Sequence, residues 1–316
     1  MMIARHAAAV KRDPSSVVTI GTFDGVHRGH RQIIDATVAG ARSRGVRSVV
    51  VTFQPHPKEV VASTRGPVRL LTTLEERLEL LQGLGVDLVY VIDFTRQFSQ
   101  QSAREFYQRN VIGEVGVSAV VVGDDHMFGR DRSAGNTELH AMGDEFGFAV
   151  HIVPACVVDG VRVSSTRVRN ALSDGDVASA ARFLGYPYRM RGRVIPGDDR
   201  GKRLGYPTAN LAPISEQKVI PARGVYVVRV GLEGETRYGM MNIGTRPTVT
   251  DAGVCTMEVH LLDFEGNLYG RTLALEFLSR LREERRFASV DELVQQLSQD
   301  REQSKNVADA WEKRAE

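Results

Sequence analysis

Cysteine is almost absent from this sequence. Its 316 residues include only Cys156 and Cys255, which lie far apart and form no CxxC motif. Because a disulfide framework or a cysteine-built zinc site needs more cysteines at closer spacing, we expect neither. So little cysteine is typical of a protein of the reducing cytoplasm, and we expect that location.

Long apolar runs are also lacking. Within the first ten residues the longest apolar run covers only positions 7–10, which is shorter than the core of a signal peptide. Later runs fall short of the length of a membrane span. We therefore expect a soluble protein with no membrane partner.

Neither sign of charge is in large excess. Lysine and arginine total 41 and aspartate and glutamate 39, so the formal net charge is only +2. A dedicated nucleic-acid binder would show a basic face or tail, and we expect no nucleic-acid partner. Small anionic ligands need only a few well-placed cations and stay compatible with this balance. The hydrophobic fraction of 42% is enough for two cores of ordinary domain size.

The first half of the chain alternates apolar, β-branched runs with helical patterns. The runs predict strands buried on both faces at 17–22, 48–53, 88–92, 118–123 and 148–153. Helical patterns lie between them at 29–45, 73–85, 102–112 and 137–147, and two more follow at 166–173 and 177–184. This order predicts an α/β domain with a doubly wound parallel sheet, in which ligands bind at the carboxyl ends of the strands.

The pattern changes after Pro187. Short strands are predicted at 192–195, 225–230, 238–243, 255–262 and 271–277, and the glycine-rich turns between them favour an antiparallel β-barrel. A C-terminal helix over 290–311 is expected to cover the barrel, with Leu293, Leu297 and Val307 among its buried positions. We place the boundary in a short hinge, which gives domains 1–186 and 187–316.

The segment from Gly21 to His30 joins the first predicted strand to the first helix. Gly21 and Gly25 let the backbone approach a ligand closely, and the helix start offers free N–H groups and a positive dipole end. His27 and His30 are three residues apart, so they project side by side over that helix start. Two imidazoles in this place can donate hydrogen bonds to phosphate oxygens during phosphoryl-group transfer.

Two other interpretations of this histidine pair stay open. One histidine would merely cap the helix while the other is buried, or the pair would bind zinc with His56 as a distant third ligand. The zinc interpretation is the weaker one, because no carboxylate or third histidine lies at a fixed helical spacing from the pair. The prolines on both sides of His56 also predict a rigid turn there.

A second glycine-bearing string runs from Gly201 to Asn210. Together with Gly197 it looks superficially like a P-loop, but the spacing is one residue short and Arg203 replaces the required serine or threonine. What remains is a loop with three cations, followed by Thr208 and Asn210, whose neutral oxygens are hard ligands of the kind that a phosphate-bound Mg²⁺ accepts. The cations are Arg200, Lys202 and Arg203. The alternative is an ordinary exposed turn that carries charged side chains and binds no ligand.

Glu258 lies on a predicted strand in which Met257, Val259 and Leu261 alternate to one side. Glu258, His260 and Leu262 therefore share the other side. The alternation does not decide whether that side faces solvent or a binding site.

The motifs of the first half resemble those of a known family. The His-x-Gly-His motif looks like that of the nucleotidylyltransferase superfamily. The whole string 21–30 is similar to the FAD synthetase domain of bacterial bifunctional riboflavin kinase/FAD synthetases, as are 53–57, 122–129 and 164–167. The resemblance implies adenylyl transfer from ATP to FMN, with His27, His30 and Arg167 as catalytic residues. It implies ATP or phosphate binding by Gly21, Phe23, Asp24, Gly25, Asp125, Ser164, Ser165 and Thr166.

Two details qualify this match. The segment 164–167 falls at a predicted helix start, where hydroxyls can cap and an arginine can bind a polyphosphate bidentately. Taken alone, an ordinary cap with an exposed arginine is an equal interpretation, and the other motifs favour the phosphate role. The family also commonly has an aromatic residue where this chain has His126, next to Asp125. This departure changes the side chain that the family match would place against the flavin or the adenine ring near residue 126.

The second string is similar to the riboflavin kinase signature of the same family, with Lys202 and Tyr206 as mild departures. The resemblance implies a six-stranded barrel that binds MgATP through Thr208 and Asn210, and a base at Glu258 that activates the riboflavin hydroxyl. It places ATP or flavin binding at Gly197, Gly201, Lys202, Gly205, Pro207, Thr208 and Asn210.

The chain is therefore expected to be a bifunctional transferase that makes FMN from riboflavin and FAD from FMN. Its implied ligands are ATP, riboflavin, FMN, FAD and Mg²⁺. Two alternatives are an adenylyltransferase for another acceptor and a non-catalytic flavin-binding protein that kept the fold.

Overall fold

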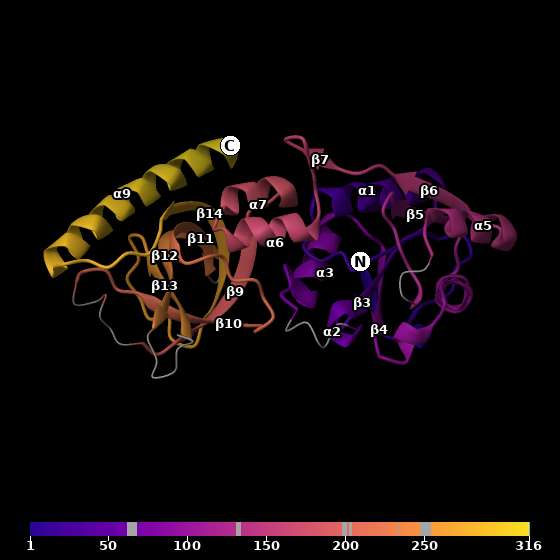
Figure 1. Ribbon diagram of the computed structural model, residues 1–316, viewed down its shortest axis with the longest axis horizontal. Helices are drawn as coiled ribbons and strands as arrows, with labels where there is room; N and C mark the ends of the chain where they lie inside the picture. The colour runs from indigo at the N-terminus through magenta and orange to yellow at the C-terminus, as the bar shows by residue number, and fades with distance from the viewer. Residues whose placement is uncertain are drawn as a thin grey trace. The chain divides into compact units, whose positions relative to one another are not determined.

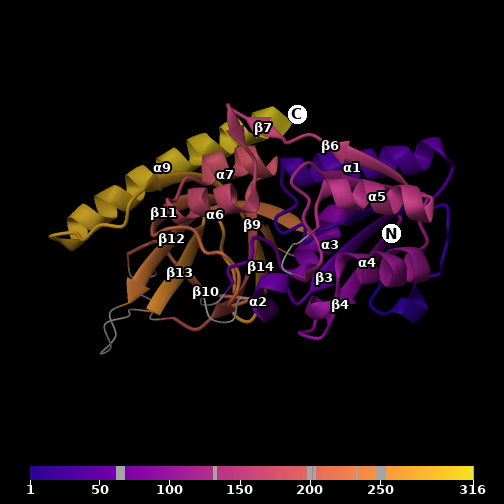
Figure 2. The same ribbon diagram turned by 45° about the vertical axis from the view of Figure 1, so that its right-hand side comes forward.

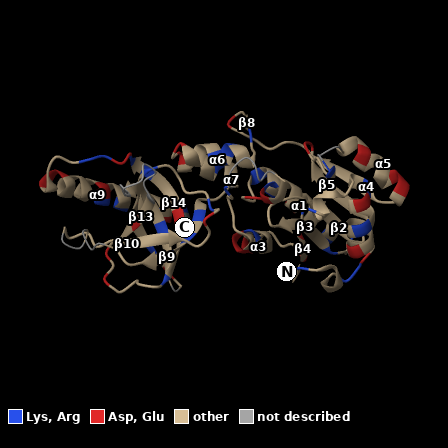
Figure 3. Cartoon of the chain, turned by 60° about the horizontal axis from the view of Figure 1, so that its bottom comes forward, with Lys and Arg blue, Asp and Glu red and all other residues tan. Residues whose placement is uncertain are grey.

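The computed structural model describes residues 1–61, 68–130, 134–197, 201, 204–232, 234–246 and 254–315. Contacts within the chain divide it into two units, Met1–Ser165 and Thr166–Glu316. Both signs of charge occur on each unit, as expected from a net charge near zero (Figure 3). Among the described residues, none of the helices combines the length and the apolar character that crossing a membrane requires.

The first unit is built around a six-stranded parallel sheet (Figure 1). Its strands are β1 (Met2–Ala4), β2 (Val17–Ile20), β3 (Ser48–Gln54), β4 (Leu88–Asp93), β5 (Ala119–Gly123) and β6 (Ala149–Val153). Its helical segments are η1 (Ala7–Ala9), α1 (Arg28–Ser43), α2 (Pro57–Val61), α3 (Leu74–Gly83), η2 (Phe98–Gln100), α4 (Ala103–Phe106), the π-helical η3 (Tyr107–Val115) and α5 (Asn136–Phe146). A small ribbon, β7 (Val157–Val158) with β8 (Val161–Arg162), follows the sheet.

The strand order is β1-β4-β3-β2-β5-β6, so β2 lies in the interior of the sheet between β3 and β5. Five of these strands were predicted from their apolar runs, and the doubly wound parallel sheet is confirmed. β1 was missed because three residues next to Arg5 and His6 are too short for a recognisable pattern. It pairs in parallel with β4 at the edge of the sheet.

Apolar helix faces cover both sides of this sheet. On one side, Ile34 and Val38 of α1 pack with α3 residues against Val50 and Val89 of the sheet. On the other side, residues of α4, η3 and α5 pack against alternate positions of the same strands, in a core that includes Tyr107. The helix predicted at 102–112 is thus two segments, and it continues to Val115.

The second unit is a closed six-stranded antiparallel barrel with helices beside it. Its strands are β9 (Tyr188–Ile195), β10 (Ala209–Pro213), β11 (Gly224–Leu232), β12 (Glu235–Arg246), β13 (Val254–Leu261) and β14 (Thr272–Arg282). Its helices are α6 (Ser165–Ser173), α7 (Val177–Leu184) and α9 (Val290–Ala315). The predicted barrel and terminal helix are confirmed, whereas β10 was missed because its proline-flanked sequence lacks an apolar alternation.

Helix α7 packs on the barrel strands β9 and β14. It buries Val177, Ala180 and Leu184, which are at most 1% exposed. The contacts therefore group residues 166–186 with the barrel, although the change in sequence pattern falls after them.

Helix α9 runs along the barrel beside β11, β12 and β14 (Figures 1 and 2). Leu293, Leu297 and Val307 were predicted to be buried and are only half-buried. The buried positions on the same face of the helix are Asp300, Ser304 and Ala308, which follow one another at intervals of four residues. Asp300 forms an ion pair there. Arg282 of β14 donates to both carboxylate oxygens of Asp300 at 2.8–3.1 Å.

Asp300→Asn should destabilise the second unit strongly. The substitution keeps the shape of the side chain but leaves the half-buried Arg282 guanidinium without its buried counter-charge, which costs about 3 kcal/mol. Asp309→Asn changes an exposed carboxylate of the same helix and should cost less than about 0.5 kcal/mol. Chemical denaturation of the two variants measures the difference, and equal stabilities would show that the ion pair does not hold α9.

Candidate active sites

The loop after β2 has an unusual backbone. Phe23 and Val26 have positive φ angles of 47° and 36°, and Gly25 lies between them with φ 86°. A side chain at Gly21 would meet the ring of Phe23 at 3.1 Å, so only glycine fits there without displacement. Because residues other than glycine adopt positive φ at a cost, such strain persists only where surrounding contacts hold it, and it is common at functional sites.

Asp24 supplies those contacts. Its carboxylate is 1% exposed and accepts hydrogen bonds from the backbone N–H groups of Leu71 and Thr72 at 3.0 Å. The Thr72 hydroxyl in turn accepts from the N–H of Gly25, and the Ser165 hydroxyl donates to the Asp24 carbonyl oxygen. Asp24 thus ties the loop to a segment 47 residues away, a partner that sequence spacing does not reveal.

His27 and His30 stand together at the start of α1. His27 is the N-cap, and its Nδ1 accepts a hydrogen bond from the backbone N–H of His30 at 3.2 Å. Since that nitrogen is an acceptor, the ring proton of neutral His27 is on Nε2. The two rings are stacked with centroids 3.6 Å apart, and the edge of Phe23 packs against His30. The predicted pair is therefore one unit of two parallel imidazoles.

Burial lowers the pKa of His30 well below its usual range, and electrostatic interaction with the neighbouring His27 and Arg77 side chains lowers it further. His30 is therefore a neutral imidazole near pH 7. Its Nδ1 is buried and meets no hydrogen-bonding partner among the residues that the structure describes. A buried polar atom without a partner is rare in proteins, and one explanation is that the group hydrogen-bonds to a ligand.

Arg77 of α3 is a charged residue that the sequence analysis did not select. Its side chain is completely buried, and Nη1 donates to the Thr52 hydroxyl and to the Phe53 carbonyl oxygen at the end of β3. Its position in an apparently ordinary amphipathic helix gave no indication of this role. The buried Arg77 side chain thus lowers the pKa of His30 and also contacts the end of β3.

Asp125 follows β5, the strand on the other side of β2 in the sheet. The chain passes from β2 to β3 on one side and reaches β5 on the other, so a crevice is expected where these strands end. Asp124 and Asp125 both pair with Arg162, at 2.6 and 3.3 Å. His126 keeps a flat ring in place of the usual aromatic, stacked on Phe128 with centroids 5.1 Å apart.

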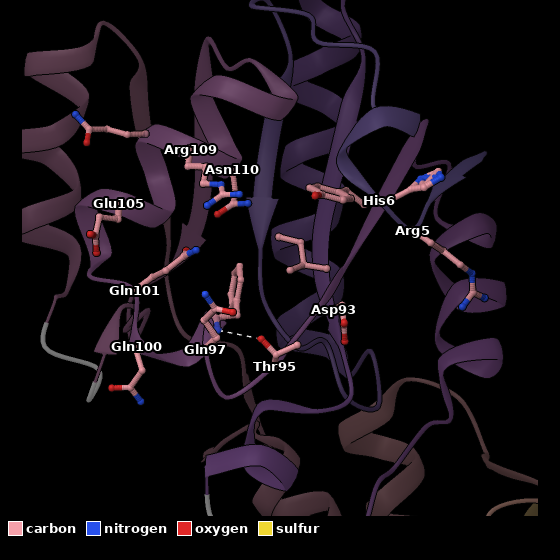
Figure 4. A pocket seen from close by; sticks show the side chains of 14 residues that line it. Arg5, His6, Asp93, Thr95, Gln97, Gln100, Gln101, Glu105, Arg109 and Asn110 are labelled. Carbon is pink, nitrogen blue, oxygen red and sulfur yellow. Dashed lines mark hydrogen bonds between the residues drawn. The ribbon is translucent and has the colours of Figure 1, made fainter.

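Aromatic rings also gather at the ends of β3 and β4. Phe94 packs edge-on against Phe53 and Phe98, and Phe98 against Phe106, with centroids 5.4–6.0 Å apart. An open cavity of about 1040 Å³ adjoins Phe98, and Figure 4 shows the polar side chains around it. It is lined by Arg5, His6, Tyr90, Ile92, Asp93, Thr95, Gln97, Phe98, Gln100, Gln101, Glu105, Gln108, Arg109 and Asn110. This list includes none of the predicted site residues.

The remaining predicted residues of the first site lie around the start of α6. Ser164 and Ser165 are half-buried, whereas Thr166 and Arg167 are exposed in the first turn of the helix. Contacts group the last two with the second unit. His56, the distant candidate for a zinc ligand, accepts the backbone N–H of Lys58 at Nδ1, which fits the interpretation as part of a turn.

In the barrel, strand register brings three polar residues to one level. Glu258 of β13 is directly opposite Asn210 of β10 on one side and Asn242 of β12 on the other. Side chains of directly opposite residues share one face of a sheet, so the two amides flank the carboxylate. The Thr208 hydroxyl is 3.4 Å from Glu258 Oε2, and all of these side chains are half-buried rather than exposed. Asn242 was not selected from the sequence, because no spacing rule links it to Glu258.

Two glycines pack directly onto this group. A side chain at Gly197 would collide with the Asn210 amide at 1.9 Å, and one at Gly201 would meet the Tyr206 carbonyl oxygen at 2.3 Å. Gly205 has φ 80°, a conformation that suits glycine, and Pro207 comes just before Thr208. Lys202 lies outside the described residues, as do Arg200 and Arg203.

Comparison with known families accounts for both halves of the chain. The family model for FAD synthetase matches residues 9–167, and the model for riboflavin kinase matches residues 184–308. The segment between these matches contains most of α6 and most of α7.

Individual relatives match over most of their length. The bifunctional riboflavin kinase/FMN adenylyltransferases of Escherichia coli K12 and Pseudomonas fluorescens are 42% and 43% identical to this chain, over 90% of each protein. That of Listeria monocytogenes is 37% identical over 93% of this chain and 92% of its own length.

A solved structure from Streptococcus pneumoniae, titled a macrolide-efflux protein, is 33% identical and superimposes with a TM-score of 0.86. It covers 96% of this chain and 98% of its own. With two family models in order and relatives of this identity, the chain belongs to the bifunctional riboflavin kinase/FMN adenylyltransferase family, with FAD synthetase in its N-terminal part and riboflavin kinase in its C-terminal part.

Proposed function

We propose that the loop 21–27 and the first turn of α1 form the site where FMN is adenylylated. A phosphate oxygen of FMN attacks the α-phosphorus of ATP, and pyrophosphate leaves. The stacked pair of His27 and His30 carries this proposal, because its rings can donate hydrogen bonds to the oxygens on which charge develops. The N–H groups of the helix start add positive potential.

Other groups complete this proposed site. Arg167 would grip the polyphosphate, and Ser164, Ser165 and Thr166 would supply hydroxyls to it. Gly21, Phe23 and Gly25 would let the loop approach ATP, with Asp24 as the group that holds the loop. Asp125 and the aromatic rings near Phe53 and Phe128 would receive the nucleotide base or the flavin.

For the kinase reaction, we propose Glu258 as the base. It takes the proton of the terminal ribityl hydroxyl of riboflavin as that oxygen attacks the γ-phosphorus of ATP, and ADP leaves. The half-buried position of Glu258 between Asn210 and Asn242 supports this role over that of a solvated strand residue. Gly197, Gly201, Lys202, Gly205 and Pro207 would shape the loop over the phosphates.

The barrel side chains beside Glu258 also suit a magnesium ion. Among the described residues, no cluster of three or more histidine, cysteine, aspartate or glutamate side chains is placed to hold a metal ion. Thr208 and Asn210 offer hard oxygens, which suits an ion that takes its remaining ligands from ATP phosphates and water. Bound there, Mg²⁺ would neutralise charge on the transferring phosphate. We further propose a cytoplasmic location, because both reactions consume ATP and both cysteines are free thiols.

His30→Ala should abolish FAD formation and leave FMN formation nearly unchanged, because each proposed site binds its own ATP. Loss of one preorganised donor corresponds to a fall of about 10²–10³-fold. Chromatography of FMN and FAD after incubation with riboflavin and MgATP measures both steps in one sample. His140→Ala removes an exposed histidine and serves as control. Equal loss of both steps in a folded variant would refute the two-site proposal.

Glu258→Gln should lower riboflavin phosphorylation by about 10²–10⁴-fold, because the amide keeps the shape of the side chain but cannot take a proton. Added FMN should still be converted to FAD. Glu265→Gln, in the exposed loop after β13, should change neither rate. An unchanged kinase rate in Glu258→Gln would return Glu258 to the role of a solvated strand residue.

The two functional domains, proposed as 1–186 and 187–316, should work as separate fragments. Both Pro187–Glu316 and the longer Thr166–Glu316 should make FMN and no FAD. The longer fragment should be more stable by at least about 3 kcal/mol, since it keeps the buried face of α7. Met1–Gly185 should convert FMN to FAD.

Activity assays and denaturation curves of the fragments measure these differences. A folded Thr166–Glu316 fragment without kinase activity would show that the kinase site needs residues from the first unit.

A further inference from the structure

His260 lies two residues after Glu258 on β13, on the same side of the strand, and no role has been assigned to it so far. Its Nδ1 is 2.8 Å from the carbonyl oxygen of Pro207. A carbonyl oxygen can only accept, so Nδ1 must carry the proton and donate it. The neutral ring is therefore fixed in one tautomer by a backbone group of the loop that precedes Thr208.

The accepting carbonyl is well placed to orient Thr208. The carbonyl of Pro207 and the nitrogen of Thr208 belong to one rigid peptide plane, so fixing that oxygen also fixes where the Thr208 side chain begins. Pro207 has no N–H of its own, which leaves this carbonyl as its only backbone hydrogen-bonding group. Strand pairing takes over two residues later, where Ala209 and Asn210 pair with β13.

The imidazole ring itself packs against an aromatic neighbour. The Tyr206 ring meets it edge-on, with centroids 5.4 Å apart. The ring is half-buried, with limited freedom to leave the Pro207 carbonyl.

We propose that His260 is a positioning residue of the kinase reaction: its Nδ1–H holds the Pro207–Thr208 peptide so that Thr208 stands opposite Glu258. It touches no reacting atom. This inference rests on the proposed kinase site and adds to it a residue that sets the placement of MgATP. The expected effect of losing the hydrogen bond is weaker use of MgATP rather than loss of the proton acceptor.

The side-chain amides offer a matched pair of test variants. In His260→Asn the amide nitrogen can occupy the place of Nδ1 and still donate to Pro207. In His260→Gln the amide reaches the place of Nε2 and cannot. We expect kcat/KM for MgATP in the kinase reaction to fall about tenfold in His260→Gln, mainly through KM, and to stay within about threefold in His260→Asn. The rate of FAD formation from added FMN, measured on the same samples, should not change in either variant.

Several outcomes would overturn the inference. A His260→Gln variant with wild-type kinetics would do so, as would equal losses in both variants. A fall in kcat with an unchanged KM for MgATP would also contradict the assigned role. Glu258→Gln, assayed in parallel, distinguishes a failure of the proposed kinase site from a failure of the inference about His260. If Glu258→Gln keeps full kinase activity, the proposed kinase site is refuted. If Glu258→Gln loses activity and His260→Gln keeps wild-type kinetics, the site stands and only the inference about His260 is refuted.

A measurement on the unmodified protein keeps the proposal testable if the variants fold poorly. Nitrogen NMR of histidine-labelled protein distinguishes the two neutral tautomers of an imidazole. His260 should be protonated at Nδ1, and binding of MgATP should leave that proton in place. A proton on Nε2 of the neutral ring would contradict the hydrogen bond to Pro207.

Discussion

The adenylyltransferase part depends on one buried carboxylate. Asp24 binds the backbone of Leu71 and Thr72, and these bonds offset the positive φ angles of the loop that begins helix α1. Without them the strained loop would relax, and the first turn of α1 with its two histidines would move. A charge that is buried and fully engaged with backbone donors is a stable anchor, since removing it would leave those donors unsatisfied in the interior.

In the barrel, strand register rather than a strained loop positions the side chains of the proposed site. Its proposed site needs no strained loop for Glu258, because antiparallel register alone sets Asn210 and Asn242 on either side of it. Register is strict, since a slip of one residue would turn the buried Met257 and Val259 outward. The one part of the site outside the ladder is the loop before β10, and this is where a side-chain hydrogen bond from His260 is found.

The sequence predicted the layers of both units because apolar runs and glycine-rich turns are local patterns. It also brought His27 and His30 together, since three residues on one helix face make neighbours in any helix. It failed where the controlling contact is distant in sequence: Thr72 with Asp24, Arg77 with the end of β3, and Arg282 with Asp300. The last of these concerns the face of α9 that was predicted to be buried: its buried positions include Asp300, whereas Leu293, Leu297 and Val307 are only half-buried.

The two reactions need different groups, and each proposed site holds the kind its reaction requires. The phosphate of FMN is already largely ionised near pH 7 and needs no base to become a nucleophile. A site for it gains from hydrogen-bond donors such as His30, which can stabilise the charge that develops on the phosphate oxygens. The hydroxyl of riboflavin is protonated and gains from a carboxylate placed within a fixed ladder. The two folds thus differ in how they would hold these groups: a helix start with imidazole donors would serve an anion, and a strand-borne glutamate would serve an alcohol.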